Sequence, residues 1–497
     1  MEGNEGYGLN RRFDALAAVS LMFACILPGL CGDNGAGPFL RGSSEGSEYL
    51  IKRDVTSIKS DFDIPEAYKR YITPEFSIEI YYNRDSVGEK GDGLGHDDSL
   101  EYQYMRDAQK SGEYKGGYSE IPDFIERLGL ALDSSWKKIF IETGFKPPQG
   151  YRDSAHDSKN YKVIVKRMDR RHFGAVYPAG RVENGQGYRS IIYINSDPAL
   201  DSVPDKHPKG ESGLMITAAH ELFHAAEYGY ARKVNRRYRM DDIPSSLFEG
   251  AAMAMEEIVF SDRDVYTDHT KGFFRDPEGF RVFGKGGDIG SGYSNALMVL
   301  FISSKTDSGI RIIRDLFKRN SQEEAAFEDL IEYAFEKSGE SWDRVLTDFF
   351  TESYFTSDRS DPEYFIDDSR LMDKWDPEPD SSGRPDPLIK AIPPQSAAIF
   401  YIKVQDTLCS GAETLRVTCK KESKSGIGVG IISEGAGNNS SVEGILYPDE
   451  WKGKEGSLLI KGQGVYTVAV VVAVNTGWRH SNRVAVEACI EADTEQK

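Results

Sequence analysis

The sequence HELFH at residues 220 to 224 constrains the fold of this chain more than any other feature. Side chains four positions apart share one face of an α-helix, so the imidazoles of His220 and His224 can reach the same cation. Glu221 projects about 100° round the helix from His220 and can act beside an open position on that ion. The motif therefore predicts a helix from about residue 213 to 230 that carries His220 and His224 as metal ligands. The alternative, an amphipathic helix with two surface histidines, needs this spacing to arise by coincidence.

A third ligand is predicted on the next helix, which begins at Pro244 and runs to Val259. Catalytic zinc is bound by three protein nitrogen or oxygen ligands and keeps a fourth position for water. Glu249 lies about one turn inside this helix, and the small residues at 250 to 252 would let the two helices approach closely. We therefore predict Glu249 as the third ligand and Zn²⁺ as the cofactor.

Two more acidic residues, Glu256 and Glu257, follow on the same helix. Glu256 is seven positions after Glu249 and shares its face, so its carboxylate could hydrogen-bond a ligand histidine. The alternative is that Glu256 and Glu257 form a solvated acidic end of the helix.

The region from residue 71 to 355 is predicted to be an α+β domain. Alternating apolar residues predict strands at 76–82, 161–166 and 190–194, and an apolar stripe predicts a helix from 121 to 142. Helical patterns continue from the HELFH helix to about Tyr354, so the second half of the domain is α-rich. The expected core is a mixed sheet beside an active-site helix. The strand at 190–194 would be either the edge of that sheet above a cleft or an interior strand.

The last part of the chain has a different composition. Residues 356–395 are rich in Asp, Pro and Ser and are predicted to be a linker. Residues 396–497 contain short apolar strands separated by turn signals, the pattern of an all-β sandwich domain. The predicted strands lie at 397–404, 415–419, 427–432, 457–460, 466–474 and 484–490. A linker here would make the β domain separable from the catalytic half.

The N-terminal sequence is typical of a secretory signal peptide. Arg11 and Arg12 precede an almost wholly apolar run from Ala15 to Leu30. We predict a signal peptide at residues 1–32 and a tether or short pro-segment at 33–70. The protein is therefore expected to be secreted or extracytoplasmic. An uncleaved N-terminal anchor is the alternative and would be its only contact with a membrane.

The charge of the chain excludes one class of partner. It has 61 basic and 80 acidic residues and a formal net charge of -19. Phosphate backbones would be repelled by most of such a surface, so nucleic acid is not expected as a partner. A protein or peptide substrate has no such difficulty.

The cysteines permit a disulfide but no zinc cluster. Cys25 and Cys31 belong to the predicted signal peptide, which leaves Cys409, Cys419 and Cys489. An exported chain could join two of these three as a disulfide. The pairing stays open, because Cys419 and Cys489 are predicted to lie on opposite faces of their strands.

Several motifs in a fixed order resemble the gluzincin branch of the zincin metallopeptidases. The segments are IPDFIE at 121–126, TAAHELFHA at 217–225, FEGAAMAMEE at 248–257 and GYSNALMVLF at 292–301, followed by a C-terminal β domain. The chain is most similar to a family of exported microbial metalloproteases, over roughly residues 75 to 490. One departure concerns calcium. The family often has an Asp- and Asn-rich loop before IPDFIE, whereas residues 115–120 (KGGYSE) lack those oxygen ligands.

The resemblance implies an exported zinc-dependent endopeptidase with a zincin-like fold. In such enzymes the catalytic Glu, here Glu221, takes a proton from metal-bound water and then protonates the leaving amine. Tyr293, just after Gly292, would direct its phenol toward the tetrahedral intermediate. The alternative for Tyr293 is a core aromatic residue at the start of a helix.

Two other functions stay open at the level of sequence. One is a catalytically silent zincin-like surface or adhesion protein, although the intact Glu221 argues against it. The other is an exopeptidase, which would need a charged pocket for a chain terminus, and no sequence feature indicates one. Of the remaining histidines, His156, His172, His207 and His269 lack ligand spacing and are predicted to be surface residues. Overlapping glycosylation sequons lie at residues 438–441.

Overall fold

The computed structural model forms two compact units. The described residues are 64, 68–83, 121–150, 160–168, 173–182, 186–196, 211–235, 240, 243–284, 289–361, 363–375, 388–403, 413–422, 426–435, 440–461 and 466–492. The first unit lies within residues 1–243, 251–264 and 317–324, and the second within 244–250, 265–316 and 325–497. The predicted signal peptide and most of the predicted tether lie outside the described residues.

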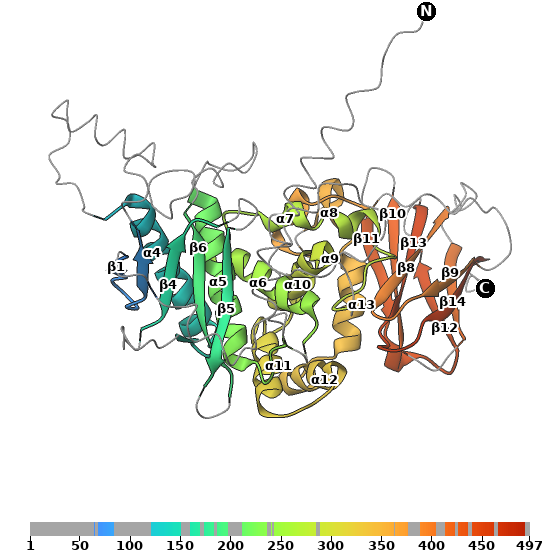
Figure 1. Ribbon diagram of the computed structural model, residues 1–497. Helices are drawn as coiled ribbons and strands as arrows, with labels where there is room; N and C mark the ends of the chain where they lie inside the picture. Colours follow the sequence, from blue (N-terminus) through green and yellow to red (C-terminus); the bar gives the residue numbers. More distant parts are fainter. Residues whose placement is uncertain are drawn as a thin grey trace, which may run out of the picture. The chain divides into compact units, whose positions relative to one another are not determined.

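The first unit contains one mixed sheet (Figure 1). Strands β1 (Lys69–Ile72), β2 (Glu79–Tyr82), β4 (Lys162–Lys166) and β6 (Tyr188–Asn195) are neighbours in that order. β2, β4 and β6 are parallel, whereas β1 is antiparallel to β2. β3 (Gln149–Gly150) and β5 (Gly174–Arg181) also pair with β6, in parallel and antiparallel orientation respectively. The predicted mixed sheet is therefore confirmed.

The sheet pairing decides between the two alternatives left open for residues 190–194. β6 pairs with β4 on one side and β5 on the other, so residues 190–194 form an interior strand. Among the described strands β5 pairs only with β6 and is an edge strand. No strand was predicted at β5, because Gly174, Pro178 and Gly180 interrupt the alternation of β-favouring residues there.

The register of β5 fixes which of its backbone groups face outward. The Asn195 N–H donates to the Phe173 carbonyl, so residues 173, 175 and 177 form the hydrogen-bonded pairs with β6. The N–H and C=O of Gly174 and Val176 therefore point away from β6, to the side of β5 on which no described strand pairs. Pro178 also occupies an outward-facing position, where its missing N–H costs the sheet no hydrogen bond.

Two long helices accompany this sheet. α4 (Asp123–Trp136) begins after Pro122 and continues as the π-helix η3 (Lys137–Glu142), which confirms the helix predicted over 121–142. α5 (Glu211–Tyr230) carries HELFH and packs against α4, β5 and β6. Its mid-section is buried all round, with Ala218, Ala219 and Leu222 fully buried. The polar side chains of His220, Glu221 and His224 are buried together with these apolar neighbours.

Helix α6 (Ser245–Val259) has residues in both units. It starts directly after Pro244, as predicted. Residues 245–250 count with the second unit and residues 251–259 with the first. At Gly250 a Cβ atom would lie 2.9 Å from the Asn295 Cβ. Close approach at this position is therefore to the segment around Asn295 in the second unit.

The second unit begins with helices and ends with sheets. Its helices are α7 (Tyr266–His269), α8 (Lys271–Arg275), α9 (Ile289–Ser294), α10 (Ala296–Lys305), α12 (Phe327–Ser338) and α13 (Trp342–Glu352), together with the first part of α11 (Arg311–Gln322). The segment GYSNALMVLF at 292–301 is divided at Asn295 between α9 and α10. Ser341 caps α13 by accepting a hydrogen bond from the Arg344 N–H.

Two antiparallel sheets in the second unit share one hydrophobic core. Their orders are β11-β10-β13-β8 and β12-β9-β14-β7. The bounds are β7 (Leu388–Ile392), β8 (Ser396–Lys403), β9 (Glu413–Lys421), β10 (Ile427–Gly435), β11 (Ser440–Leu446), β12 (Glu455–Lys461), β13 (Tyr466–Asn475) and β14 (Asn482–Ala492). Side chains such as Phe400, Val417, Val471 and Val484 meet between the sheets. The predicted all-β region is confirmed, with β7 and β11 in addition to the predicted strands.

The predicted linker at 356–395 contains packed structure. It includes short 3₁₀-helices η5 (Ser357–Arg359) and η6 (Asp367–Leu371) and the strand β7. Phe365 and Trp375 are each 1% exposed. The described parts of this segment, 356–361, 363–375 and 388–395, are therefore packed structure and not an extended linker, and residues 376–387 lie outside the described residues.

Helix α13 lies directly on the outer face of one sheet. It packs against β10 and β13. A Cβ atom at Gly428 would overlap Thr347 Oγ1, and one at Gly430 would overlap Thr351 Oγ1. The two glycines on β10 thus make room for the threonines of α13, and helices and sheets of the second unit share a continuous interior.

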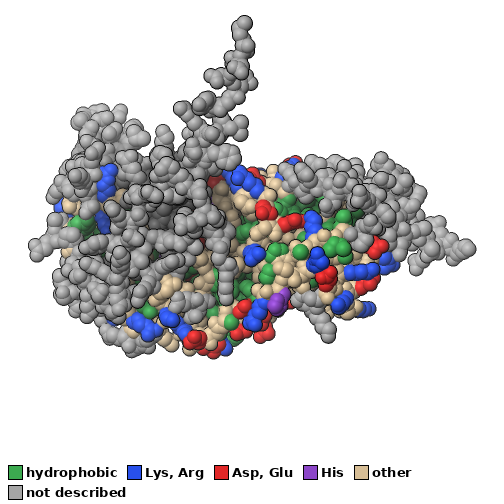
Figure 2. Space-filling view, turned by 45° about the vertical axis from the view of Figure 1, so that its right-hand side comes forward, with side chains coloured by type: hydrophobic (Ala, Val, Ile, Leu, Met, Phe, Trp, Pro, Cys, Tyr) green, Lys and Arg blue, Asp and Glu red, His purple; other side chains and the backbone are tan. Residues whose placement is uncertain are grey.

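The described surface carries charges of both signs. On the face shown in Figure 2, acidic and basic side chains are interspersed with apolar ones. Among the described residues, no helix combines the length and the hydrophobicity that a membrane span requires.

Candidate metal site

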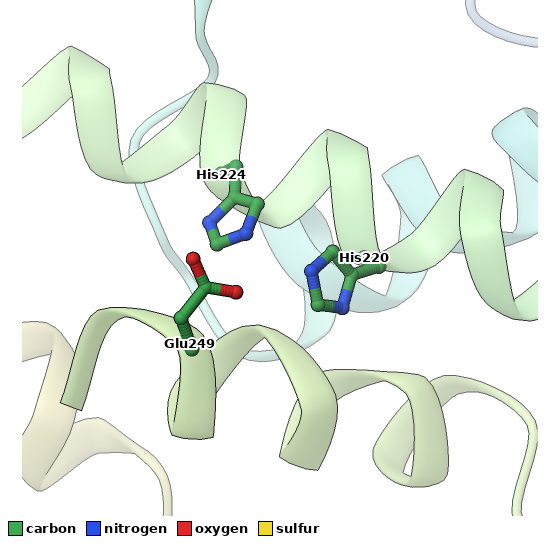
Figure 3. Close-up of side chains that lie close together, drawn as sticks. All are labelled: His220, His224 and Glu249. Carbon is green, nitrogen blue, oxygen red and sulfur yellow. The ribbon is translucent and has the colours of Figure 1, made fainter. Parts of the chain in front are cut away.

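Three buried side chains come together as a possible metal site (Figure 3). His220 and His224 project from one side of α5 toward Glu249 on α6. One ligand atom from each residue lies within 4.8 Å of the other two. His220 is 0% exposed, and His224 and Glu249 are each 4% exposed. This group could hold a metal ion, as the sequence predicted.

Each histidine is oriented by a carboxylate. His220 Nδ1 lies 2.6 Å from Glu256 Oε1, and His224 Nδ1 lies 2.7 Å from Glu227 Oε2. With Nδ1 engaged in a hydrogen bond, Nε2 is the ring nitrogen that each histidine can present to a metal. The arrangement matches the carboxylate–histidine pairs that surround protein-bound metals.

One of these two carboxylates, that of Glu256, was expected from the sequence. The expected contact of Glu256 with a ligand histidine is confirmed, and Glu256 and Glu257 are both buried rather than forming a solvated helix end. Glu227 was not predicted. Its position three residues after His224 places it on the same face of α5, and that spacing was the available signal.

The donor set fits a divalent transition metal. Two imidazole nitrogens and a carboxylate oxygen are common ligands of zinc, and they also suit other ions of this class. Buried carboxylates at Glu227 and Glu256 add negative charge around the site, which favours a cation.

Glu221 lies against the edge strand β5. It is 0% exposed. A Cβ atom at Gly174 would lie 2.7 Å from Glu221 Cγ and 2.8 Å from its Oε1, and 2.9 Å from Thr217 Cγ2. The α5 side chains therefore touch the backbone of β5 at this point, and the Glu221 carboxylate is held next to β5, an edge strand among the described strands.

The negative charge of Glu221 affects the pKa of a nearby tyrosine, Tyr161. Tyr161 is buried, and its hydroxyl is 2.8 Å from Ser190 Oγ. Burial raises the pKa of the Tyr161 hydroxyl, the hydrogen bond with Ser190 lowers it, and the negative charge of Glu221 raises it further. Tyr161 therefore stays protonated. Its hydroxyl is close enough to Glu221 for the two groups to interact electrostatically.

Tyr293 lies in the second unit on the segment that meets the start of α6. Gly292, the preceding residue, packs against Glu249, because a Cβ atom at Gly292 would lie 3.5 Å from the Glu249 Cβ. Tyr293 is 1% exposed, and its ring packs edge-on against His269 with 5.5 Å between centroids. His269, predicted to be a surface residue, is half-buried.

The remaining predicted features are placed only in part. His156, His172 and His207 lie outside the described residues, as do the sequon asparagines at 438 and 439.

Cys419 is buried as a free thiol, and burial raises its pKa to about 12. In the backbone register of β9 with β14, Cys419 is paired with Val486 and Cys489 with Arg416, so these two positions are not direct cross-strand partners. Cys409 is outside the described residues.

Comparison with known proteins adds no relative. No family model matches the chain, and no curated protein matches it either. The resemblance to gluzincins therefore rests on the sequence motifs alone.

Proposed function

We propose that this protein is a zinc-dependent endopeptidase of the gluzincin type that uses Glu221 as its general base. The observation that carries the proposal is the buried group of His220, His224 and Glu249, with the Glu221 carboxylate adjacent to the first ligand on α5. Structural zinc sites are usually closed by four protein ligands, whereas three ligands suit a catalytic site with an open position.

Zinc is proposed because its preferences match the donor set. It accepts imidazole nitrogen and carboxylate oxygen together, and the histidine–carboxylate pairs are typical of its sites. When bound, an ion of this kind acts as a Lewis acid that activates water and polarises a carbonyl group. His220, His224 and Glu249 would hold it, and Glu227 and Glu256 would keep the two imidazoles oriented.

Glu221 would move the proton. Its carboxylate would accept a proton from the attacking water and return it to the leaving amine. Because Glu221 is buried and touches β5, its carboxylate has a fixed location and is shielded from bulk water. Such shielding strengthens the electrostatic effect of the carboxylate on a nearby reacting group.

The free edge of β5 is the proposed peptide-binding element. The outward N–H and C=O groups of Gly174 and Val176 can form a ladder with an extended peptide. Gly174 is also the residue that touches Glu221, so a peptide paired there would pass beside the general base. This assignment moves the binding edge from the sequence-based candidate, residues 190–194, to β5.

The proposal is tested by metal analysis combined with an assay on casein. We expect about one zinc per chain, cleavage of casein, loss of cleavage with a zinc chelator and recovery on adding zinc. Glu221→Gln is the matched control, since it should bind zinc without cleaving. Zinc binding without cleavage by the wild type would favour the silent surface protein. Mapping of the cleavage sites separates the two peptidase types, because an exopeptidase releases only terminal residues.

Export is proposed from the N-terminal sequence alone. Residues 1–32 have the pattern of a signal peptide, and the expected substrate is an extracytoplasmic protein or peptide. Expression with and without residues 1–32 tests this, because only the full chain should reach the culture medium.

A further inference from the structure

We propose that Gly174 is a positioning residue for Glu221, required because any side chain at this position would displace the general base. The proposal rests on the function proposed for Glu221. It concerns a residue on β5, a strand without a recognisable sequence signal.

The contact is unusually close. The nearest atoms to a Cβ at position 174 are Glu221 Cγ at 2.7 Å, Glu221 Oε1 at 2.8 Å and Thr217 Cγ2 at 2.9 Å. Real Cβ atoms essentially never approach other heavy atoms within 3.0 Å. All three atoms belong to α5 side chains, so an added methyl group would act on Glu221 and Thr217 first.

Backbone conformation does not explain the glycine. Several other glycines of the chain have a positive φ, among them Gly180 and Gly187, whereas Gly174 is not one of them. Gly174 lies in a regular antiparallel pairing with Ile194, a conformation that alanine adopts readily. The requirement for glycine at 174 therefore comes from the space taken by the two α5 side chains.

Thr217 cannot easily give way. Its hydroxyl donates a 2.6 Å hydrogen bond to the Gly213 carbonyl one turn earlier, which fixes its rotamer. The helix itself is held by fully buried neighbours such as Ala218 and Leu222. An added methyl group would therefore act mainly by moving the Glu221 side chain.

A small displacement of the base matters. A catalytic group must be held within about 0.5 Å of its productive geometry, and a misplacement of about 1 Å can lower the rate on the order of 100-fold. The metal ligands are not among the nearest neighbours of position 174. Gly174→Ala should therefore lower kcat on the order of 100-fold while metal content stays at the wild-type level. KM should change little, because alanine keeps the backbone groups that would pair with a peptide.

Gly229→Ala is the matched control. Gly229 lies near the end of α5, and a Cβ atom there meets no atom within 4 Å. This variant should keep wild-type kcat and metal content. An equal loss of kcat in Gly174→Ala and Gly229→Ala would overturn the proposal.

A stability cycle tests the contact without any assay of activity. Gly174→Ala should lower the melting temperature in the wild-type background and lower it much less in a Glu221→Ala background, where the displaced side chain is absent. Thr217→Ala should likewise restore part of kcat in Gly174→Ala, since it frees space beside the new methyl group. If Gly174→Ala unfolds or destabilises the protein equally with and without Glu221, the proposal is overturned. If wild type shows no peptidase activity but the cycle shows coupling, the contact stands and the proposed function fails.

Discussion

His224 Nδ1 lies 2.7 Å from Glu227 Oε2. Glu227 follows His224 by three residues on α5, and both side chains are almost completely buried. The carboxylate fixes the orientation of the imidazole and makes it a stronger ligand. Glu227→Gln, which weakens this acceptor without changing its size, should lower zinc affinity about 10- to 100-fold. Competition with a chelator measures the affinity. Glu142→Gln, on the exposed end of η3, is the control and should bind zinc as the wild type does.

The third ligand can be distinguished from its neighbour on α6. Glu249→Ala should remove most of the bound zinc, because it deletes a ligand, whereas Glu256→Ala should lower affinity only about 10- to 100-fold by releasing His220. Metal content after dialysis against a weak chelator gives the comparison. A larger loss in Glu256→Ala than in Glu249→Ala would place the ligand two turns further along the helix.

Glu221→Gln should separate metal binding from turnover. The substitution keeps the shape of the side chain but removes its ability to accept a proton, so zinc content should match the wild type while kcat falls by at least about 100-fold. Zinc analysis and the casein assay on the same sample measure both properties. Near-normal kcat in this variant would contradict the mechanism.

The β-sandwich should be required for folding of the second unit. Thr347 and Thr351 of α13 fit over Gly428 and Gly430 of β10, and Trp342 stacks on Trp478 with 5.6 Å between ring centroids. A chain ending at residue 387 would expose this face of α13 and should aggregate. Gel filtration and circular dichroism measure the outcome. A monomeric, helical and zinc-binding truncated chain would show instead that the sandwich is separable, as the composition of residues 356–395 alone indicates.

The second unit should lose stability between acid and neutral pH. Burial raises the pKa of Glu352 from 4.5 to about 7, with Lys305 lowering it and Asp348 raising it. The native state therefore binds a proton at Glu352 more tightly than the unfolded chain does. The stability that this protonation gives to the native state is lost as the pH rises from about 4.5 to about 7. Glu352→Gln should melt at a higher temperature than the wild type at about pH 8 and should show a weaker pH dependence. Equal melting temperatures for the two proteins at that pH would contradict the expectation.

Local patterns in the sequence were sufficient for the site helices. The spacing of His220 and His224 and the Pro244 start of α6 depend on neighbouring residues only, so both helices and Glu249 could be placed without a structure. β5 could not, because Gly174, Pro178 and Gly180 interrupt the local strand pattern, and the strand is evident only from its pairing with β6. The packing of Thr347 on Gly428 joins positions far apart in the chain, and no local pattern reports such a contact.

Pro178 limits how far another chain can associate with β5. An open sheet edge is a template for aggregation, since any extended segment can pair with its exposed amides. Along the outward side of β5, Gly174 and Val176 offer an N–H group and Pro178 offers none, and the pairing with β6 becomes irregular directly after it. An extended segment that paired along this edge would find backbone donors at Gly174 and Val176 but none at Pro178, and the proline that ends this short run removes no hydrogen bond from the sheet.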